Sequence, residues 1–395
     1  MKLSFAVCPI AGFICLALAT GAQVGGNGRK GVNYEVGNGM DQLNCDGGNV
    51  SQIAADMREL RGLKVQWVRV ETSMTEQSGQ LKPPVCPALA EFQGLKNLLS
   101  GIKTADAQPL INILGYHYDS SMRAGYIAWL NRLLDAAPEA LAFEVGNEEN
   151  LSKSTEGWKG APIGDYPDGW EFHAWDFAGN DAVGKCPSDP AKFRDVDQAV
   201  ASYVSWLADT YNTIKRKRPR STVVLGGLSS WQAQCWTQEL GKHQAWRYAD
   251  AIGFHPYGAT PAQSLATFNY FLPVMQNWPR KLPVWVTEFG FTTMTRSPNA
   301  VATEGQKAQA LETEYKMLEA KVGGPILYYT ARDFPLTARQ WQEQCASEAC
   351  VQDKKHTNPG YISGTNWDVS GAGLFEWLNG KLVIEPSYEA LAGFH

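Results

Sequence analysis

The sequence of 395 residues predicts an α/β protein with a (β/α)8 barrel, the TIM-barrel fold. Short apolar runs rich in strand-forming residues alternate with longer amphipathic stretches from residue 31 to the C-terminus. This alternation is typical of a parallel sheet whose strands are joined by helices. Eight such runs are present, and eight parallel strands joined by helices predict a sheet that closes into a barrel.

Each expected strand is a short run rich in β-branched and aromatic residues. In chain order the expected strands are 31–35, 65–70, 109–114, 141–148, 222–228, 251–257, 284–288 and 326–330. Helical periodicity is found between them, with examples at 50–60, 89–105, 126–136, 196–217 and 303–322, and a last helix over 388–394 is expected to close the ring. The chain exceeds the typical barrel of about 250 residues, and the excess predicts long loops after strands four and eight.

The ends of the chain predict its domain organisation. Residues 1–22 carry a basic residue, Lys2, near the start, continue as an apolar run and end in small residues, which predicts a cleaved signal peptide and a secreted protein. The alternative, a membrane anchor, is disfavoured because the run contains Pro9 and Gly12 and lacks a basic stop signal. Residues 23–30 form a short Gly-rich linker, and residues 31–395 are expected to form a single barrel domain.

Removal of the leader leaves six cysteines, an even number that favours disulfide bonds in an exported protein. Proximity suggests a pair between Cys345 and Cys350, and the remaining connectivity stays open. Neither Cys-x-x-Cys nor His-x3-His spacing is present, which disfavours a zinc site. We expect neither a metal nor a cofactor. Sequons at Asn49 and Asn150 allow N-glycosylation in a eukaryotic host.

The charge pattern excludes several partners. A net charge of -5 without a concentrated Lys/Arg stripe disfavours nucleic-acid binding. The one basic cluster, 215–220, ends a helical pattern, where cations favour the negative pole of the helix dipole. No later segment is expected to enter a membrane after signal cleavage, and a monomer is expected.

Strand four carries a carboxylate to the mouth of the expected barrel. Side chains alternate between the two faces of a strand. The large residues Leu141, Phe143 and Val145 share one face and are expected to pack under the helices. Glu148 belongs to the other face, with Ala142, Glu144 and Gly146. The barrel interior therefore receives Glu148 at the C-terminal mouth, which is the reactive end of barrel enzymes.

The same alternation on strand seven places Glu288 inward together with Val284 and Val286, as the last strand residue before a Gly-bearing loop. Two carboxylates are thus expected to face one cavity from opposite walls. Taken singly, either glutamate is as readily explained as a surface charge. As a pair they match glycoside hydrolysis with retention, in which one carboxyl protonates the leaving oxygen and a second, about 5–5.5 Å away, attacks the anomeric carbon.

These residues resemble motifs of the clan A glycoside hydrolases, also called the 4/7 superfamily. The stretch Phe143-Glu-Val-Gly-Asn-Glu-Glu-Asn150 is similar to the strand-four motif, which implies that Glu148 is the acid/base and that Asn147 binds the 2-hydroxyl of the sugar. The stretch 286–290 is similar to the strand-seven motif, which implies that Glu288 is the nucleophile. Many members carry Pro where this chain has Glu149, whose opposite parity places it outside catalysis.

Other positions of the family are matched. Arg69 faces inward by parity and is expected to keep the nucleophile ionised, with the deeper Glu144 as a structural partner. His255 and Tyr257 resemble the family's His-x-Tyr, in which the Tyr hydroxyl contacts the nucleophile and the His lines the cleft. His117, after strand three, either contacts substrate or packs in a turn.

The stretch 149–195 is long for a loop between a strand and a helix and is rich in aromatic residues, including Trp170 and Trp175. Aromatic rings bury the apolar faces of sugars well, so a substrate platform is one interpretation and a self-packed small core is the other. Further candidates for the cleft are Trp231, Trp341 and Trp367.

The sequence thus predicts a secreted retaining endo-β-glycosidase that hydrolyses a β-linked polysaccharide or oligosaccharide by double displacement, with β-glucan favoured. The alternatives are an exo-acting β-glycosidase or transglycosylase, and a non-catalytic sugar-binding barrel. The last predicts loss of one glutamate, and both are present. Sugar identity, linkage and endo or exo action are set by loop geometry and stay open.

Overall fold

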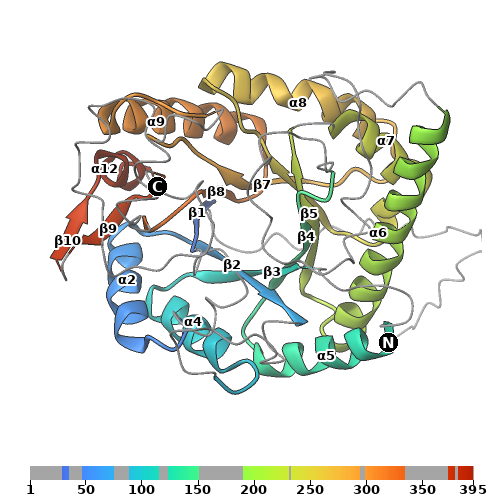
Figure 1. Cartoon of the computed structure of the whole chain (residues 1–395), viewed down its shortest axis with the longest axis horizontal. Coiled ribbons are helices and arrows are strands. Elements are labelled where there is room, and N and C mark those ends of the chain that lie inside the picture. Colours follow the sequence, from blue (N-terminus) through green and yellow to red (C-terminus); the bar gives the residue numbers. More distant parts are fainter. Residues whose placement is uncertain are drawn as a thin grey trace, which may run out of the picture.

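A computed structural model describes residues 29–34, 47–74, 89–114, 123–150, 190–230, 233–293, 299–333, 372–378 and 381–394. Within them, eight parallel strands follow one another around a closed barrel, and helices surround it (Figure 1). The predicted (β/α)8 barrel is therefore confirmed. The segments expected to form long loops after the fourth and eighth strands lie largely outside the described residues.

All eight predicted strands are present, with ends shifted by a few residues. The barrel strands are β1 Lys30–Asn33, β2 Trp67–Ser73, β3 Gln108–Leu114, β4 Ala142–Asn147, β5 Thr222–Ser229, β6 Ala251–His255, β7 Val284–Phe289 and β8 Ile326–Tyr328. A separate antiparallel pair, β9 Phe375–Leu378 and β10 Lys381–Ile384, follows near the C-terminus and was not predicted. Leu141 precedes β4 and is 45% exposed, so its predicted place under the helices is wrong.

The helices predicted from periodicity are also found. The described helices are α2 Val50–Gly62, α4 Gln93–Thr104, α5 Arg123–Ala136, α6 Pro190–Lys217, α7 Ala233–Lys242, η2 Ala245–Arg247, α8 Pro261–Met275, α9 Glu304–Lys321 and α12 Pro386–Ala392. Of these, α7 and α8 were not among the predicted examples. The start of α8 has a local explanation: the Thr260 hydroxyl accepts a hydrogen bond from the Gln263 backbone, and Pro261 occupies the first turn.

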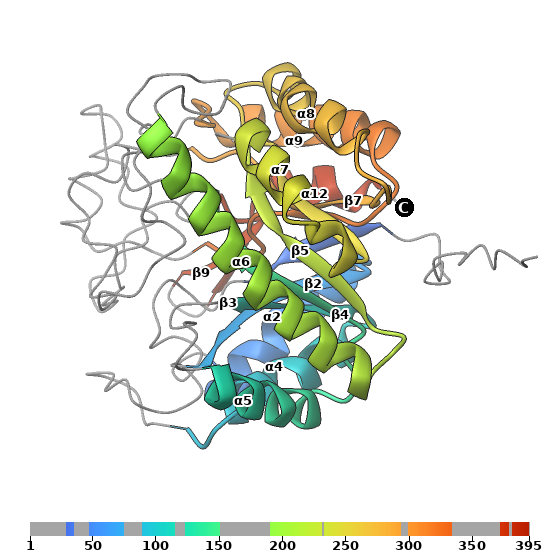
Figure 2. The ribbon, with the colours of Figure 1, turned by 90° about the vertical axis from the view of Figure 1, so that its right-hand side faces the viewer.

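Two apolar layers hold the barrel together. The larger core lies between the sheet and the helices, and the long helix α6 lies along the outside of the barrel beside α5 and α7 (Figure 2). A smaller cluster fills the barrel interior, where Trp67 and Trp285 meet edge to face with ring centroids 5.2 Å apart. The other members of this interior cluster are Leu110, Ala142, Val224, Ala251 and Leu327. The polar side chains of the site therefore lie above a packed apolar cluster in the barrel interior.

The alternation on β7 differs from the prediction. Val284 and Val286 belong to the outer core, whereas Trp285 faces the interior. The register between β7 and β8 shifts between Val286 and Phe289, because β7 covers three residue positions there while the paired stretch of β8 covers two. A bulge of this kind turns two successive side chains to one face. Glu288 consequently faces the interior, as predicted, although Val284 and Val286 do not.

The C-terminal helix α12 packs against α9 and completes the wall near β1 (Figure 1). The buried Lys30 ammonium donates to the backbone oxygens of Leu391 at 3.2 Å and Phe394 at 2.6 Å. This contact ties the first strand to the end of the chain, as the predicted closing helix required. Over the described part of the chain, none of the helices has the length and apolar character needed to cross a membrane.

Candidate active site

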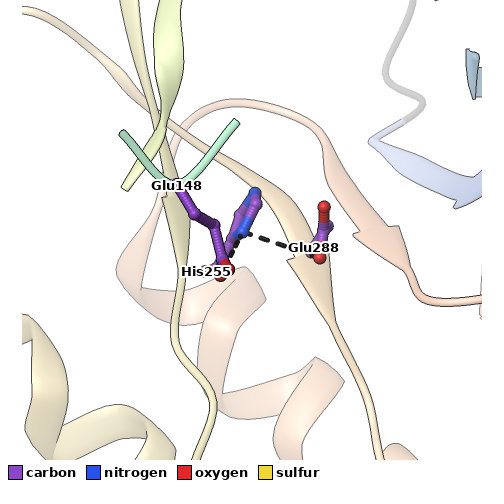
Figure 3. A group of neighbouring side chains, drawn as sticks. All are labelled: Glu148, His255 and Glu288. Carbon is purple, nitrogen blue, oxygen red and sulfur yellow. Dashed lines mark hydrogen bonds and ion pairs between the residues drawn. The ribbon is translucent and has the colours of Figure 1, made fainter. Parts of the chain in front are cut away.

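Three side chains meet at the carboxyl ends of the barrel strands (Figure 3). Glu148 directly follows β4, His255 ends β6, and Glu288 lies on β7. One oxygen of each glutamate and a ring nitrogen of His255 all lie within 4.8 Å of one another. The two glutamates singled out by the sequence are thus brought together at one site.

Each carboxylate oxygen of Glu288 accepts a hydrogen bond. The Arg69 Nη1 donates to Oε1 at 2.9 Å, and the Tyr257 hydroxyl donates to Oε2 at 2.9 Å. Both contacts agree with the places predicted for Arg69 and Tyr257. Burial raises the pKa of Glu288, and the positive charges of His255 and Arg69 oppose the rise.

Arg69 is the charged centre beneath the site and is fully buried. Its Nε donates to Glu144 Oε2 at 2.5 Å, which is the structural pairing expected for Glu144. Its Nη1 also donates to Asn33 Oδ1 at 2.9 Å, and its Nη2 donates to Asn147 Oδ1 at 2.6 Å. Burial alone would lower the pKa of Arg69, but the carboxylates of Glu144 and Glu288 outweigh it and raise the pKa. Asn33 was not among the site residues expected from the sequence. It follows Val32, which faces the outer core, so strand alternation would have placed Asn33 inward.

His255 connects the two carboxylates. Its Nδ1 lies 3.0 Å from Glu148 Oε1 and 3.5 Å from Glu288 Oε2, and its Nε2 lies 3.1 Å from the Thr287 hydroxyl. Burial alone would lower the pKa of His255, but Glu288 and Glu148 raise it overall. A Cβ at Gly227 would overlap the imidazole, so glycine is required at that point of β5.

The backbone around Glu148 is unusual. Glu148 has a φ of 53°, in the left-handed region that non-glycine residues rarely adopt. Its N–H donates to the backbone oxygen of Gly227 at 2.8 Å, which anchors the end of β4 on β5. Such outliers cluster at functional sites, where surrounding contacts hold them in place.

Glu149 is buried beside Gly146 and Asn147. Its Oε1 accepts a hydrogen bond from the Asn147 backbone at 3.3 Å, and a Cβ at Gly146 would come within 2.7 Å of that oxygen. Burial raises the pKa of Glu149 to about 8. This carboxyl therefore packs, in its neutral form, behind the turn that carries Asn147 and Glu148, and the sequence did not indicate its burial.

Glu71 is a further carboxylate that the sequence did not single out. It lies on β2 two residues after Arg69, and Asn112 Nδ2 on β3 donates to its Oε1 at 3.1 Å. Its Oε1 lies 3.6 Å from Arg69 Nη1. Strand alternation would have placed it inward as well.

The grouping of Glu148, His255 and Glu288 has spacings that could hold a cation. The guanidinium of Arg69, 2.9 Å from Glu288, disfavours this because it would repel a metal ion at that carboxylate. Several predicted substrate contacts lie outside the described residues: His117, Trp170, Trp175, Trp231, Trp341 and Trp367. So do the predicted disulfide cysteines other than Cys235, which is buried at the start of α7.

The fold of this chain is similar to that of several solved proteins. A GH5_18 protein from Streptomyces cattleya in complex with GlcNAc matches over 92% of this chain and 79% of its own, with 15% identity and a TM-score of 0.59. A GH5_18 protein from Bifidobacterium longum subsp. longum in complex with Manb1-4GlcNAc matches over 92% and 77%, with 10% identity and a TM-score of 0.58. A β-glycosidase named BGL167 matches over 92% and 94%, with 13% identity and a TM-score of 0.54.

At these identities the likeness establishes the shared (β/α)8 fold, which is the fold that the clan A resemblance implied. No protein-family model and no curated protein sequence matches the chain.

Proposed function

We propose that this chain is a retaining β-glycosidase of the clan A type, with Glu148 as acid/base and Glu288 as nucleophile. The observation that carries the proposal is the separation of at most 4.8 Å between an oxygen of Glu148 and an oxygen of Glu288. Retaining enzymes hold their carboxyl groups about 5–5.5 Å apart, whereas inverting enzymes leave about 6.5–9.5 Å for a water molecule. The short separation favours double displacement.

In the first step, an oxygen of Glu288 attacks the anomeric carbon while the protonated carboxyl of Glu148 gives its proton to the departing glycosidic oxygen. Arg69 and Tyr257 each hold one oxygen of Glu288, so the attacking carboxylate is oriented before substrate arrives. In the second step, the Glu148 carboxylate takes a proton from water, which attacks the anomeric carbon and releases Glu288.

Asn147 fits the proposed contact with the 2-hydroxyl of the sugar. Its Oδ1 is occupied by Arg69 Nη2 at 2.6 Å, so the NH2 group is the part of the amide that can donate to substrate. A hydrogen bond at this hydroxyl strengthens as the oxocarbenium-like transition state forms.

The finer proposal is a secreted, monomeric, endo-acting enzyme that hydrolyses a β-glucan. It rests on the signal-peptide pattern of residues 1–22 and on the aromatic stretch with Trp170 and Trp175, joined by Trp231 and His117 as substrate contacts. Sugar ligands in the two GH5_18 structures support a carbohydrate partner. The alternatives remain an exo-acting glycosidase or transglycosylase, and a non-catalytic sugar-binding barrel, which the presence of both glutamates disfavours.

Mature protein is expected to release reducing ends from β-1,3- or β-1,4-linked glucan without added metal. Proton NMR of the first product should show the β-anomer, because retention follows from two inversions. Oligosaccharide products would support endo action, and monosaccharide alone would favour the exo alternative. An α-anomer as the first product would contradict the assignment of mechanism, and no release from any β-glycan would favour the sugar-binding barrel.

A further inference from the structure

Glu71 is a carboxylate at the site that the proposed double displacement does not use. It follows Arg69 by two positions on β2, and Val70 between them belongs to the outer core. Alternation along a strand therefore directs Glu71 to the same interior face as Arg69. On β3 its partner in register is Asn112, whose amide bonds it.

Glu71 is more open than the other charged groups around Arg69. Its side chain is 27% exposed, compared with 7% for Glu288 and 0% for Glu144. Asn112 holds Oε1, and among the residues that the structure describes no donor is found for Oε2. Burial raises the pKa of Glu71, while the charge of Arg69 and the hydrogen bond from Asn112 oppose the rise. A carboxylate oxygen with accessible lone pairs is a strong hydrogen-bond acceptor.

Carboxyl groups outnumber cationic side chains at the site. In the described part of the chain, three of them pair with Arg69 and two with His255, and Glu288 belongs to both sets. These carboxyl groups belong to Glu71, Glu144, Glu148 and Glu288.

All three guanidinium nitrogens of Arg69 are engaged. Nε is bound to Glu144, Nη1 to Asn33 and Glu288, and Nη2 to Asn147. The guanidinium therefore cannot form a bidentate pair with a carboxylate of the substrate.

We propose that Glu71 contacts the substrate directly: its carboxylate accepts a hydrogen bond from a hydroxyl of the sugar held over Glu288, and the site selects neutral sugars against uronic acids. This inference rests on the proposed glycosidase function. A sugar hydroxyl can donate to Glu71, whereas a uronate carboxylate cannot donate and adds a like charge. Like charges brought together in a binding site cost several kcal/mol and are a common means of excluding wrong ligands.

Covalent labelling with two gluco-configured cyclophellitol aziridines tests this inference, one bearing a hydroxymethyl group and the other a carboxylate at the 6-position. Intact-mass spectrometry gives the labelling rate of each, independent of any leaving group. Wild type is expected to react at least about 100-fold faster with the neutral reagent. In Glu71→Gln the neutral reagent should react about tenfold more slowly, and the preference for it should fall by about tenfold.

Two further variants keep the result interpretable. Glu71→Asp keeps the negative charge but has a shorter side chain. Its preference for the neutral reagent should therefore stay near that of wild type, while the rate of labelling by that reagent falls. Glu139→Gln, at an exposed site before β4, should change neither quantity. Equal selectivity in wild type and Glu71→Gln, or faster labelling of wild type by the carboxylate reagent, would overturn the inference. Failure of both reagents to label wild type would instead overturn the proposed action on a glucose-containing β-glycan.

Discussion

Replacement of Glu149 by glutamine should stabilise the protein in a strongly pH-dependent way. The folded chain raises the pKa of Glu149 from 4.5 to about 8 because the carboxyl is buried. Below pH 4.5 both folded and unfolded chains carry the proton, so this group adds no penalty there. Between 4.5 and 8 the unfolded chain loses the proton and the folded chain keeps it, so stability falls as pH rises, by about 1.4 kcal/mol per pH unit.

The magnitude follows from the two pKa values. At pH 6 the buried carboxyl lowers the free energy of unfolding of wild type by about 2 kcal/mol, and from pH 8 upward this loss levels off at about 5 kcal/mol. Glutamine cannot ionise and keeps an acceptor for the Asn147 N–H, which Glu149 now binds at 3.3 Å. The stability difference between Glu149→Gln and wild type should therefore grow over this range.

Urea unfolding followed by tryptophan fluorescence at pH 4.5, 6, 7 and 8 measures this difference. Glu139→Gln is the matched control, because an exposed carboxylate should give a difference that stays flat with pH. A constant difference between Glu149→Gln and wild type from pH 4.5 to 8 would refute the reasoning that burial keeps Glu149 neutral.

Two further substitutions test the contacts around the catalytic pair. Tyr257→Phe removes one of the two hydrogen bonds to Glu288. Because a hydrogen bond to a charged group contributes about 1.5–3 kcal/mol, kcat/KM on a β-glycan should fall roughly 10–100-fold, with little change in Tm. An unchanged kcat/KM would show that the hydroxyl is dispensable. Gly227→Ala places a Cβ against the imidazole of His255 and should lower both Tm and kcat, by about tenfold or more for kcat. Gly125→Ala on α5, where a Cβ meets nothing within 4 Å, is the control and should slightly raise Tm; the same response in both glycine variants would contradict the packing argument.

Much of the fold could be predicted because its physical signals are local. Apolar runs separated by helical periodicity located all eight strands, and alternation on β2 and β4 correctly directed Arg69 and Glu144 inward. The family-like motifs then picked out Glu148 and Glu288, which the fold brings within 4.8 Å. These inferences succeed because each depends on one strand at a time.

The rest depends on contacts between strands. The register shift on β7 arises from its pairing with β8, so strict alternation assigned Val284 and Val286 to the wrong face. The burial of Glu149 results from its packing on Gly146, which a run of polar residues after a strand does not reveal. Glu71 would have followed from alternation, but no motif drew attention to it.

Azide rescue of the two glutamate variants tests the central claim, that Glu148 and Glu288 have different roles in a double displacement. Glu148→Ala should lose most activity on polysaccharide but still form the covalent intermediate from an activated aryl glycoside, since its leaving group needs no proton. General-acid assistance is worth about 10²–10⁴-fold, so the defect should be largest for poor leaving groups.

With added azide, Glu148→Ala should turn over faster and yield the β-glycosyl azide, because azide attacks the intermediate formed on Glu288. Glu288→Ala should be inactive on both substrates and, with azide, yield the α-glycosyl azide from a single inversion. Azide products of the same configuration from both variants, or the same dependence on leaving group, would contradict the assignment of the two glutamates and the retaining mechanism with it.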